Sequence, residues 1–152
     1  MNIRICVPAV PIAQPRPRAR AMVGGDGTTR ATVYQPKKHP STEFKSTVRM
    51  AAQKVYTGPP LTGALRVDCE FVFPRTRAQI WKRKPMPRMH HVKKPDRDNL
   101  DKAVCDALTG LLWVDDCQVC DGRVQKWIAS GDEQPHVTIT VTPIIEFVQT
   151  EN

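Results

Sequence analysis

Aspartates gather in one short stretch of this chain. Asp96 and Asp98 are separated by a single residue, and the adjacent pair Asp115 and Asp116 follows beyond an apolar stretch. Carboxylate oxygens are hard ligands that suit Mg²⁺, with Mn²⁺ as a substitute. A cation held by such groups polarises a phosphodiester oxygen and activates water for in-line attack. The spacing therefore predicts a metal site with the ligands Asp96, Asp98 and at least one of Asp115 and Asp116.

A lysine completes this chemistry. Lys102 follows Asp98 by one helical turn, so its ammonium can stabilise the transition state or orient the attacking water. Asp106 follows by another turn and either extends the site or forms an ion pair with Lys102. A purely structural interpretation also stays open, with Asp98 as a helix N-cap and Asp115 and Asp116 as an ordinary turn.

The acidic stretch lies in a basic protein. The 152 residues include 23 Lys and Arg against 15 Asp and Glu, a formal net charge of +8. This balance favours a polyanionic partner, DNA or RNA, and the length predicts one domain over residues 1–152. We expect no membrane span and a cytoplasmic location, since no apolar run reaches the roughly 18 residues needed. The five cysteines include one Cys-x-x-Cys pair, at 117 and 120, and are predicted to be reduced and mostly buried.

Hydrophobic periodicity predicts the elements that position these residues. Helical spacing indicates helices from Ser41 to about residue 57 and over 98–109, and alternation indicates strands over 3–10, 63–73, 119–128 and 135–142. The expected fold is therefore mixed α/β or α+β, with about four strands packed against two main helices. Trp113 and Trp127 are predicted to be core residues.

Two basic segments interrupt these elements. Residues 11–40 and 75–94 are rich in proline and cations, which predicts loops. The first is interpreted either as a phosphate-contacting arm or as a solvated segment, and the second as a mobile loop in which Trp81 contacts DNA. Residues 144–152 are expected to form a short C-terminal tail.

Longer motifs extend the acidic stretch. The run 94–110 reads KPDRDNLDKAVCDALTG, and DDCQV follows at residues 115–119. Upstream lie QPRPR at 14–18 and YQPKK at 34–38. Together these motifs resemble the RusA family of Holliday junction resolvases over roughly residues 5–142, including a downstream lysine matched by Lys126.

The resemblance implies a Mg²⁺-dependent endonuclease of DNA recombination and repair. Such an enzyme acts as a homodimer and cuts two opposed strands of a four-way junction, in a bacterial or phage-infected cell. The implied catalytic residues are Asp96, Asp98, Lys102 and Asp116, with Asp115 as an additional metal ligand. The expected DNA-binding residues are Arg16, Arg18, Lys37, Lys38, Lys93, Lys94 and Lys126.

Two other functions remain open from the residues alone. One is a non-catalytic basic module that binds nucleic acid, in which the carboxylates only cap helices and offset local charge. The other is a metal nuclease for flaps or forks, because the same chemistry cleaves any correctly positioned phosphodiester. Metal-dependent cleavage would distinguish a nuclease from the non-catalytic module. The choice of branched substrate would distinguish a junction resolvase from a flap or fork nuclease.

Overall fold

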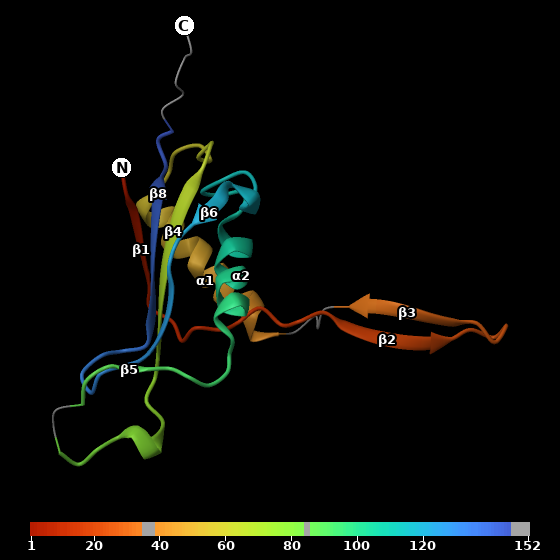
Figure 1. Ribbon diagram of the computed structural model, residues 1–152, viewed down its shortest axis with the longest axis horizontal. Coiled ribbons are helices and arrows are strands. Elements are labelled where there is room, and N and C mark those ends of the chain that lie inside the picture. Colours follow the sequence, from red (N-terminus) through yellow and green to blue (C-terminus); the bar gives the residue numbers. More distant parts are fainter. Residues whose placement is uncertain (35–38, 84–85, 147–152) are drawn as a thin grey trace, which may run out of the picture.

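The computed structural model describes residues 1–34, 39–83 and 86–146. Six strands of this part form one sheet in the order β1-β8-β4-β7-β5, with β6 also paired to β4. Two helices, α1 and α2, cover the sheet, and a separate two-stranded hairpin projects from the body (Figure 1). The mixed α+β prediction is confirmed. The strands of the sheet are β1 (Ile3–Val7), β4 (Leu65–Phe73), β5 (Met89–His90), β6 (Val119–Asp121), β7 (Val124–Ile128) and β8 (His136–Pro143).

Strand β4 lies at the centre of the sheet. It pairs antiparallel with β8 on one side and parallel with β6 and β7 on the other. Leu65, Val67, Cys69 and Phe71 alternate toward the helices and are almost fully buried, as their period of two predicts. The intervening polar residues are only partly covered, so the sheet has one packed face and one polar face.

Helix α1 (Pro40–Val55) buries Phe44, Val48 and Ala52. Its N-cap is His39, whose ring nitrogen accepts a hydrogen bond from the Ser41 amide at 3.1 Å. The predicted N-cap Ser41 therefore lies just inside the helix. Helix α2 (Arg97–Leu108) packs against α1 and buries an apolar stripe, as its helical period predicts: Leu100, Ala103, Val104, Ala107 and Leu108.

The chain reverses directly after α2. Gly110 has a φ of +84°, which favours glycine, and its amide donates to the carbonyl of Trp113 at 2.6 Å. Trp113 is fully buried, as predicted, and its indole nitrogen donates to the Thr109 hydroxyl at 3.0 Å. This reversal directs the following segment back along the helix, toward the short 3₁₀ helix η2 (Asp116–Gln118) and β6.

The prediction that residues 11–40 form a loop is wrong over its middle. Strands β2 (Arg18–Val23) and β3 (Thr29–Tyr34) form an antiparallel hairpin there. The turn contains Gly27 at a φ of +82°, and the Asp26 carboxylate accepts hydrogen bonds from the amide and hydroxyl of Thr28. Arg and Ala, which alternate at the start of β2, have a low strand propensity. Together with the glycine-rich turn, they make this segment resemble a loop in the sequence.

The segment 75–94 is also more ordered than predicted in its described part. It contains the 3₁₀ helix η1 (Arg77–Gln79) and β5. Arg75 donates to the carbonyls of Ala129 and Gln79 at 2.8 and 2.6 Å, and Arg88 forms ion pairs with Glu70 and Glu133. Opposite charges and backbone acceptors thus hold both arginines on the body. The sequence could not reveal these partners because most of them lie far away along the chain.

Two further expectations are corrected at the C-terminal half. The strand predicted over 119–128 is split into β6 and β7 at Gly122, whose φ is +150°. Trp127 is only half-buried and stacks on the His90 ring with centroids 4.3 Å apart. The hairpin, β5 and this split raise the strand number above the expected four. No helix in the described ranges is long and apolar enough to cross a lipid bilayer.

Candidate active site

The first two predicted ligands lie at the N-terminal end of α2. Asp96 is the N-cap residue and Asp98 lies in the first turn, so Asp98 is not the N-cap itself. The two residues therefore do not share an extended segment. A carboxylate in the first turn is favoured by the positive end of the helix dipole.

A cleft of about 530 Å³ opens beside Asp96. It is lined by Arg16, Lys94, Pro95, Asp96 and Asn99, so three predicted residues from two separate motifs meet in one place. Arg16 Nη2 lies 3.3 Å from Asp96 Oδ2 in an ion pair that is largely open to solvent. Exposed pairs of this kind contribute only about 0–1 kcal/mol, so Arg16 can readily exchange its partner.

Gln14 fixes the approach of the Arg16 segment. Its backbone amide donates to the carbonyl of Asn99 at 3.0 Å, and its side-chain oxygen accepts from Lys45 Nζ at 2.7 Å. Gln14 is only 6% exposed. It therefore joins the N-terminal segment to α1 and α2 at once. Sequence reasoning missed this role, although Gln14 opens the QPRPR motif.

Lys102 and Asp106 form an ion pair across one turn of α2. The Lys102 ammonium lies 3.3 Å from Asp106 Oδ1. The interpretation of Asp106 as an ion-pair partner is thus confirmed. The Lys102 side chain remains 57% exposed, which leaves it accessible to a phosphate.

The adjacent acids Asp115 and Asp116 differ in their surroundings. Asp115 is the N-cap of η2: its carboxylate accepts from the Cys117 amide at 3.0 Å, and the Gln118 side-chain oxygen accepts from the Asp115 amide at 3.0 Å. Hydrogen bonding to the Cys117 amide lowers the pKa of Asp115. Gln118 also donates to the carbonyls of Leu61 and Gly63. Asp115 therefore has a structural task that Asp116 does not share.

Asp116 lies close enough to α2 to act on Cys105. Burial and, to a smaller extent, the charges of Asp101, Asp116 and Asp106 together raise the pKa of the Cys105 thiol to about 12. Asp101 is itself half-buried, and loss of solvation raises its pKa. Asp116 thus acts electrostatically on Cys105, which lies about two turns beyond Asp98 along α2. Asp101 belongs to this acidic side of α2 and was not singled out from the sequence.

The carboxylates follow the length of α2 and do not converge on one point. Within the part of the chain that the structure describes, no three His, Cys, Asp or Glu side chains form a group able to hold a metal ion. Mg²⁺ is commonly bound through one or two carboxylates together with water and substrate phosphate, so it does not require such a group. The oxygen-only donor set fits this ion. The four-ligand set Asp96, Asp98, Asp115 and Asp116 stays a prediction.

The other predicted DNA contacts are placed unevenly. Lys126 Nζ donates to the Lys93 carbonyl at 2.6 Å, which brings these two predicted residues together. The charge of Lys126 adds to burial in lowering the pKa of His91. The Arg18 side chain and the residues Lys37 and Lys38 lie outside what the structure describes. Trp81 is exposed, with the Arg75 guanidinium 5.2 Å from its ring centroid, and its DNA contact stays a prediction.

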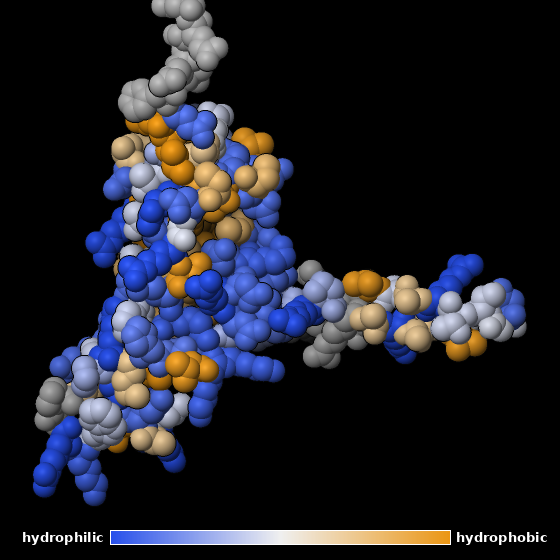
Figure 2. Space-filling model, viewed as in Figure 1, coloured by the Kyte–Doolittle hydropathy of each residue, from blue (hydrophilic) through white to orange (hydrophobic). Residues whose placement is uncertain are grey.

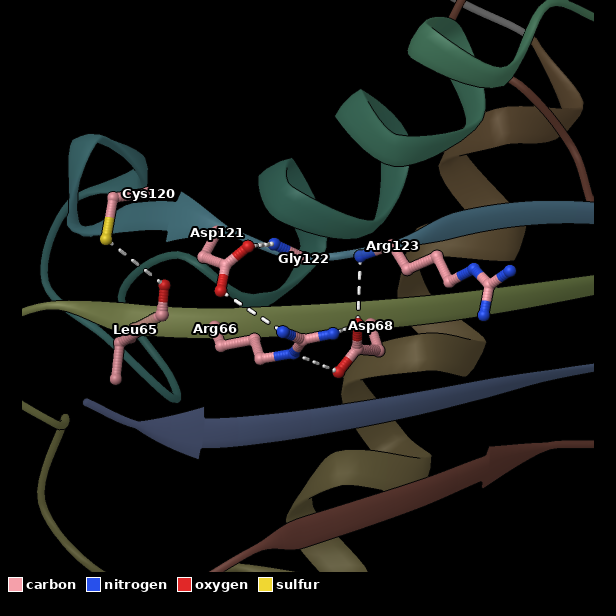
Figure 3. Close-up of polar contacts among 7 residues, drawn as sticks. All are labelled: Leu65, Arg66, Asp68, Cys120, Asp121, Gly122 and Arg123. Carbon is pink, nitrogen blue, oxygen red and sulfur yellow. Dashed lines mark hydrogen bonds and ion pairs between the residues drawn. The ribbon is translucent and has the colours of Figure 1, made fainter.

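A polar cluster beside the split between β6 and β7 secures the segment that follows Asp116. Arg66 on β4 forms ion pairs with Asp68 at 2.9 Å and with Asp121 at 3.2 Å (Figure 3). The Asp68 carboxylate also accepts from the Arg123 amide at 2.9 Å. Hydrogen bonding to Arg66 lowers the pKa of Asp68 and thereby favours its charged form. Both sides of Gly122 are thus tied to the central strand.

The cysteines do not form a zinc or disulfide site in the described structure. All five are free, and the expectation that most are buried is wrong, since only Cys69 and Cys105 are buried. Cys120 of the Cys-x-x-Cys pair contacts the Leu65 carbonyl with its sulfur at 3.7 Å. Cys117 in η2 and Cys120 in β6 are both exposed.

Comparison with known proteins agrees with this arrangement. The profile of the family described as "Endodeoxyribonuclease RusA" matches residues 8–142. The chain is also similar to the "Uncharacterized protein YqaN" of Bacillus subtilis (strain 168), with 29% identity over 147 residues that cover 93% of this chain and 96% of that protein. The matched span includes the cleft beside Asp96, all of α2 and the η2 acids. The chain belongs to the RusA endodeoxyribonuclease family.

Proposed function

We propose that this protein is a Mg²⁺-dependent endonuclease that resolves four-way DNA junctions as a homodimer, in DNA recombination and repair. The observation that carries the proposal is the cleft at the start of α2, where Asp96 lies between Arg16 and Lys94. A carboxylate for a cation and two basic groups for a phosphate are what hydrolysis of a phosphodiester requires. Membership of the RusA family supports DNA as the substrate.

The protein side chains divide the work between them. Asp96 and Asp98 would hold Mg²⁺, with Asp116 of η2 as the third acid. The ion supplies charge stabilisation at the phosphate and lowers the pKa of a bound water. Arg16 and Lys94 bind the phosphate, and the exposed ammonium of Lys102 stabilises charge that develops during cleavage.

The ion pair between Arg16 and Asp96 has a consequence for order of binding. A cation on Asp96 competes with Arg16 for the same carboxylate oxygen, which is 3.3 Å from the guanidinium. Release of Arg16 makes it available to DNA. Binding of a cation would therefore strengthen binding of a phosphate in the cleft. The cation would take the place of Arg16 at Asp96, and the released Arg16 would bind the phosphate.

Cleavage of defined substrates tests the proposal. Purified protein is incubated with a synthetic four-way junction, a matched linear duplex and a flap, in Mg²⁺ or in EDTA. We expect paired symmetric cuts in the junction alone, lost in EDTA and in Asp98→Asn. Binding without metal-dependent cuts contradicts the proposal in favour of a non-catalytic module, and equal cutting of the flap contradicts junction selectivity.

A charge-matched variant controls for non-specific effects. Asp132→Asn removes one negative charge from the turn that precedes β8, away from α2 along the chain. It should cut the junction at the wild-type rate while Asp98→Asn loses activity by about 10²-fold or more. Sedimentation of the same samples checks the expected dimer.

A further inference from the structure

The projecting β2–β3 hairpin has two chemically different faces. In an antiparallel pair, directly opposed residues share a face and the faces alternate along each strand. The register opposes Arg20 to Thr32 and Met22 to Arg30, which places both arginines on one face. The other face carries only small or apolar residues and one threonine: Ala19, Ala21, Val23, Thr29, Ala31 and Val33.

Both faces are open to solvent. The hairpin forms its own two-stranded sheet, separate from the six-stranded one, and stands away from the body (Figure 1). Apolar and hydrophilic surface alternates along it (Figure 2). Among the described residues, no carboxylate is ion-paired with Arg20 or Arg30, and Asp26 at the tip is bonded to Thr28. Two unneutralised guanidinium groups thus lie on an exposed ribbon.

We propose that the Arg20 and Arg30 face of this hairpin binds the phosphate backbone of a DNA duplex arm next to the cleft. Diagonal neighbours across a strand pair lie about 7–8 Å apart, so the two arginines can contact neighbouring phosphates of one strand. The apolar face is too narrow to be a dimer interface by itself, because a stable interface needs about 800 Å² from each partner. Charge complementarity therefore favours DNA as the occupant.

The hairpin continues the basic surface of the cleft. Arg20 follows Arg16, which lines the cleft, by four positions, or at most about 14 Å of chain. A backbone that leaves the cleft at Arg16 can thus pass directly along the ribbon. The inference rests on the proposed function, which supplies DNA as the substrate. The hairpin adds a contact outside the reacting centre and thereby fixes how a DNA duplex leaves the site.

The salt dependence of DNA binding tests this inference. Binding of the four-way junction is measured in EDTA for wild type and for the double variant Arg20→Gln with Arg30→Gln, between 50 and 200 mM salt. Loss of two phosphate contacts should lower the slope of log K against log salt by about 1.8, so the affinity defect shrinks roughly 12-fold across this range. Because EDTA prevents metal-dependent cleavage, the result does not depend on whether the protein cuts.

Two matched variants make the result specific. Arg4→Gln with Lys54→Gln removes the same formal charge from β1 and the end of α1, and should leave the slope close to wild type. Val23→Thr with Val33→Thr changes the opposite face of the hairpin at nearly constant shape and should also bind normally. An unchanged slope in the arginine variant overturns the proposal, as does an equal loss in the Arg4 and Lys54 variant. Weakened DNA binding only in the valine variant would also overturn the proposal, because it would assign the DNA contact to the opposite face.

These outcomes separate the inference from the proposed function. If the protein cuts junctions in Mg²⁺ but the arginine variant shows no change of slope, the proposed DNA contact of the hairpin is refuted and the proposed nuclease function stands. If the slope changes but the protein never cuts, the nuclease function is refuted and the DNA contact of the hairpin stands. Thermal unfolding of each variant checks that the body is folded, which we expect because the hairpin forms a separate sheet.

Discussion

Gly122 is expected to be the glycine least able to accept a side chain. Its φ is +150°, and a Cβ added there would lie 1.9 Å from the Val67 carbonyl oxygen and 2.7 Å from its carbon. Contacts under 3.0 Å are essentially never observed, so backbone would have to move by about 1.1 Å. Both neighbours of Gly122 are held by the Arg66 cluster, which prevents an easy shift (Figure 3).

The cost of Gly122→Ala can be estimated from two contributions. An unfavourable backbone conformation costs about 1–3 kcal/mol, and steric overpacking adds about 1–3 kcal/mol. We therefore expect the free energy of unfolding to fall by about 3–5 kcal/mol. For a chain of this size that lowers Tm by roughly 6–20 °C.

Two other glycines provide matched controls for this substitution. Gly110 has a φ of +84° but open space around its Cβ position, so Gly110→Ala should cost only about 1–2 kcal/mol. Gly25 has neither a positive φ nor a neighbour within 4 Å, and Gly25→Ala should change stability by less than about 0.5 kcal/mol. Urea unfolding of the three variants measures the series. Equal midpoints for Gly122→Ala and Gly110→Ala would refute the close approach of Gly122 to β4.

Three further predictions concern the acids, the ion pairs and the buried thiol. Asp116→Asn should abolish junction cleavage with unchanged Tm, whereas Asp115→Ala should lower the unfolding free energy by about 1 kcal/mol through its lost cap, as measured by urea unfolding beside the cleavage assay. Arg88→Met should lower the free energy of unfolding by about 3 kcal/mol at pH 7, because two carboxylates lose their partner. The difference from wild type should shrink as pH falls below 4.5. Arg88 lowers the pKa of Glu133 in the folded state, and the resulting stabilisation is lost when Glu133 is protonated. A pH-independent difference would argue against the ion pair. Cys105 should resist alkylation at pH 8 while exposed thiols react within minutes, and peptide mapping that finds Cys105 modified in the folded protein would contradict its burial.

The regular elements were predictable because their signals are local. The alternation over Leu65–Phe73 and the helical stripe that begins at Leu100 each match burial in the structure. The hairpin was missed because Arg and Ala dominate its first strand, and composition outweighed the alternation that its register reveals. The split at Gly122 was missed since a single glycine in a strand pattern indicates a bulge only weakly.

The candidate site was predictable in its composition more than in its geometry. The pairing of Arg16 with Asp96 joins residues 80 positions apart, and no periodicity links them. Asp115 and Asp116 are identical neighbours in the sequence, and only the cap of η2 distinguishes them. The spread of the carboxylates along α2 likewise depends on where the chain returns after Gly110. Which of them hold metal stays a prediction.

Gln14 joins the segment that leads to the hairpin to both helices. Its backbone amide donates to the carbonyl of Asn99, the residue directly after Asp98, and its buried side-chain oxygen accepts from Lys45 on α1. Only Pro15, Arg16 and Pro17 separate Gln14 from the start of β2. If the hairpin binds a duplex arm as proposed, a pull on the hairpin by bent DNA reaches the first turn of α2 through this short segment, next to Asp98.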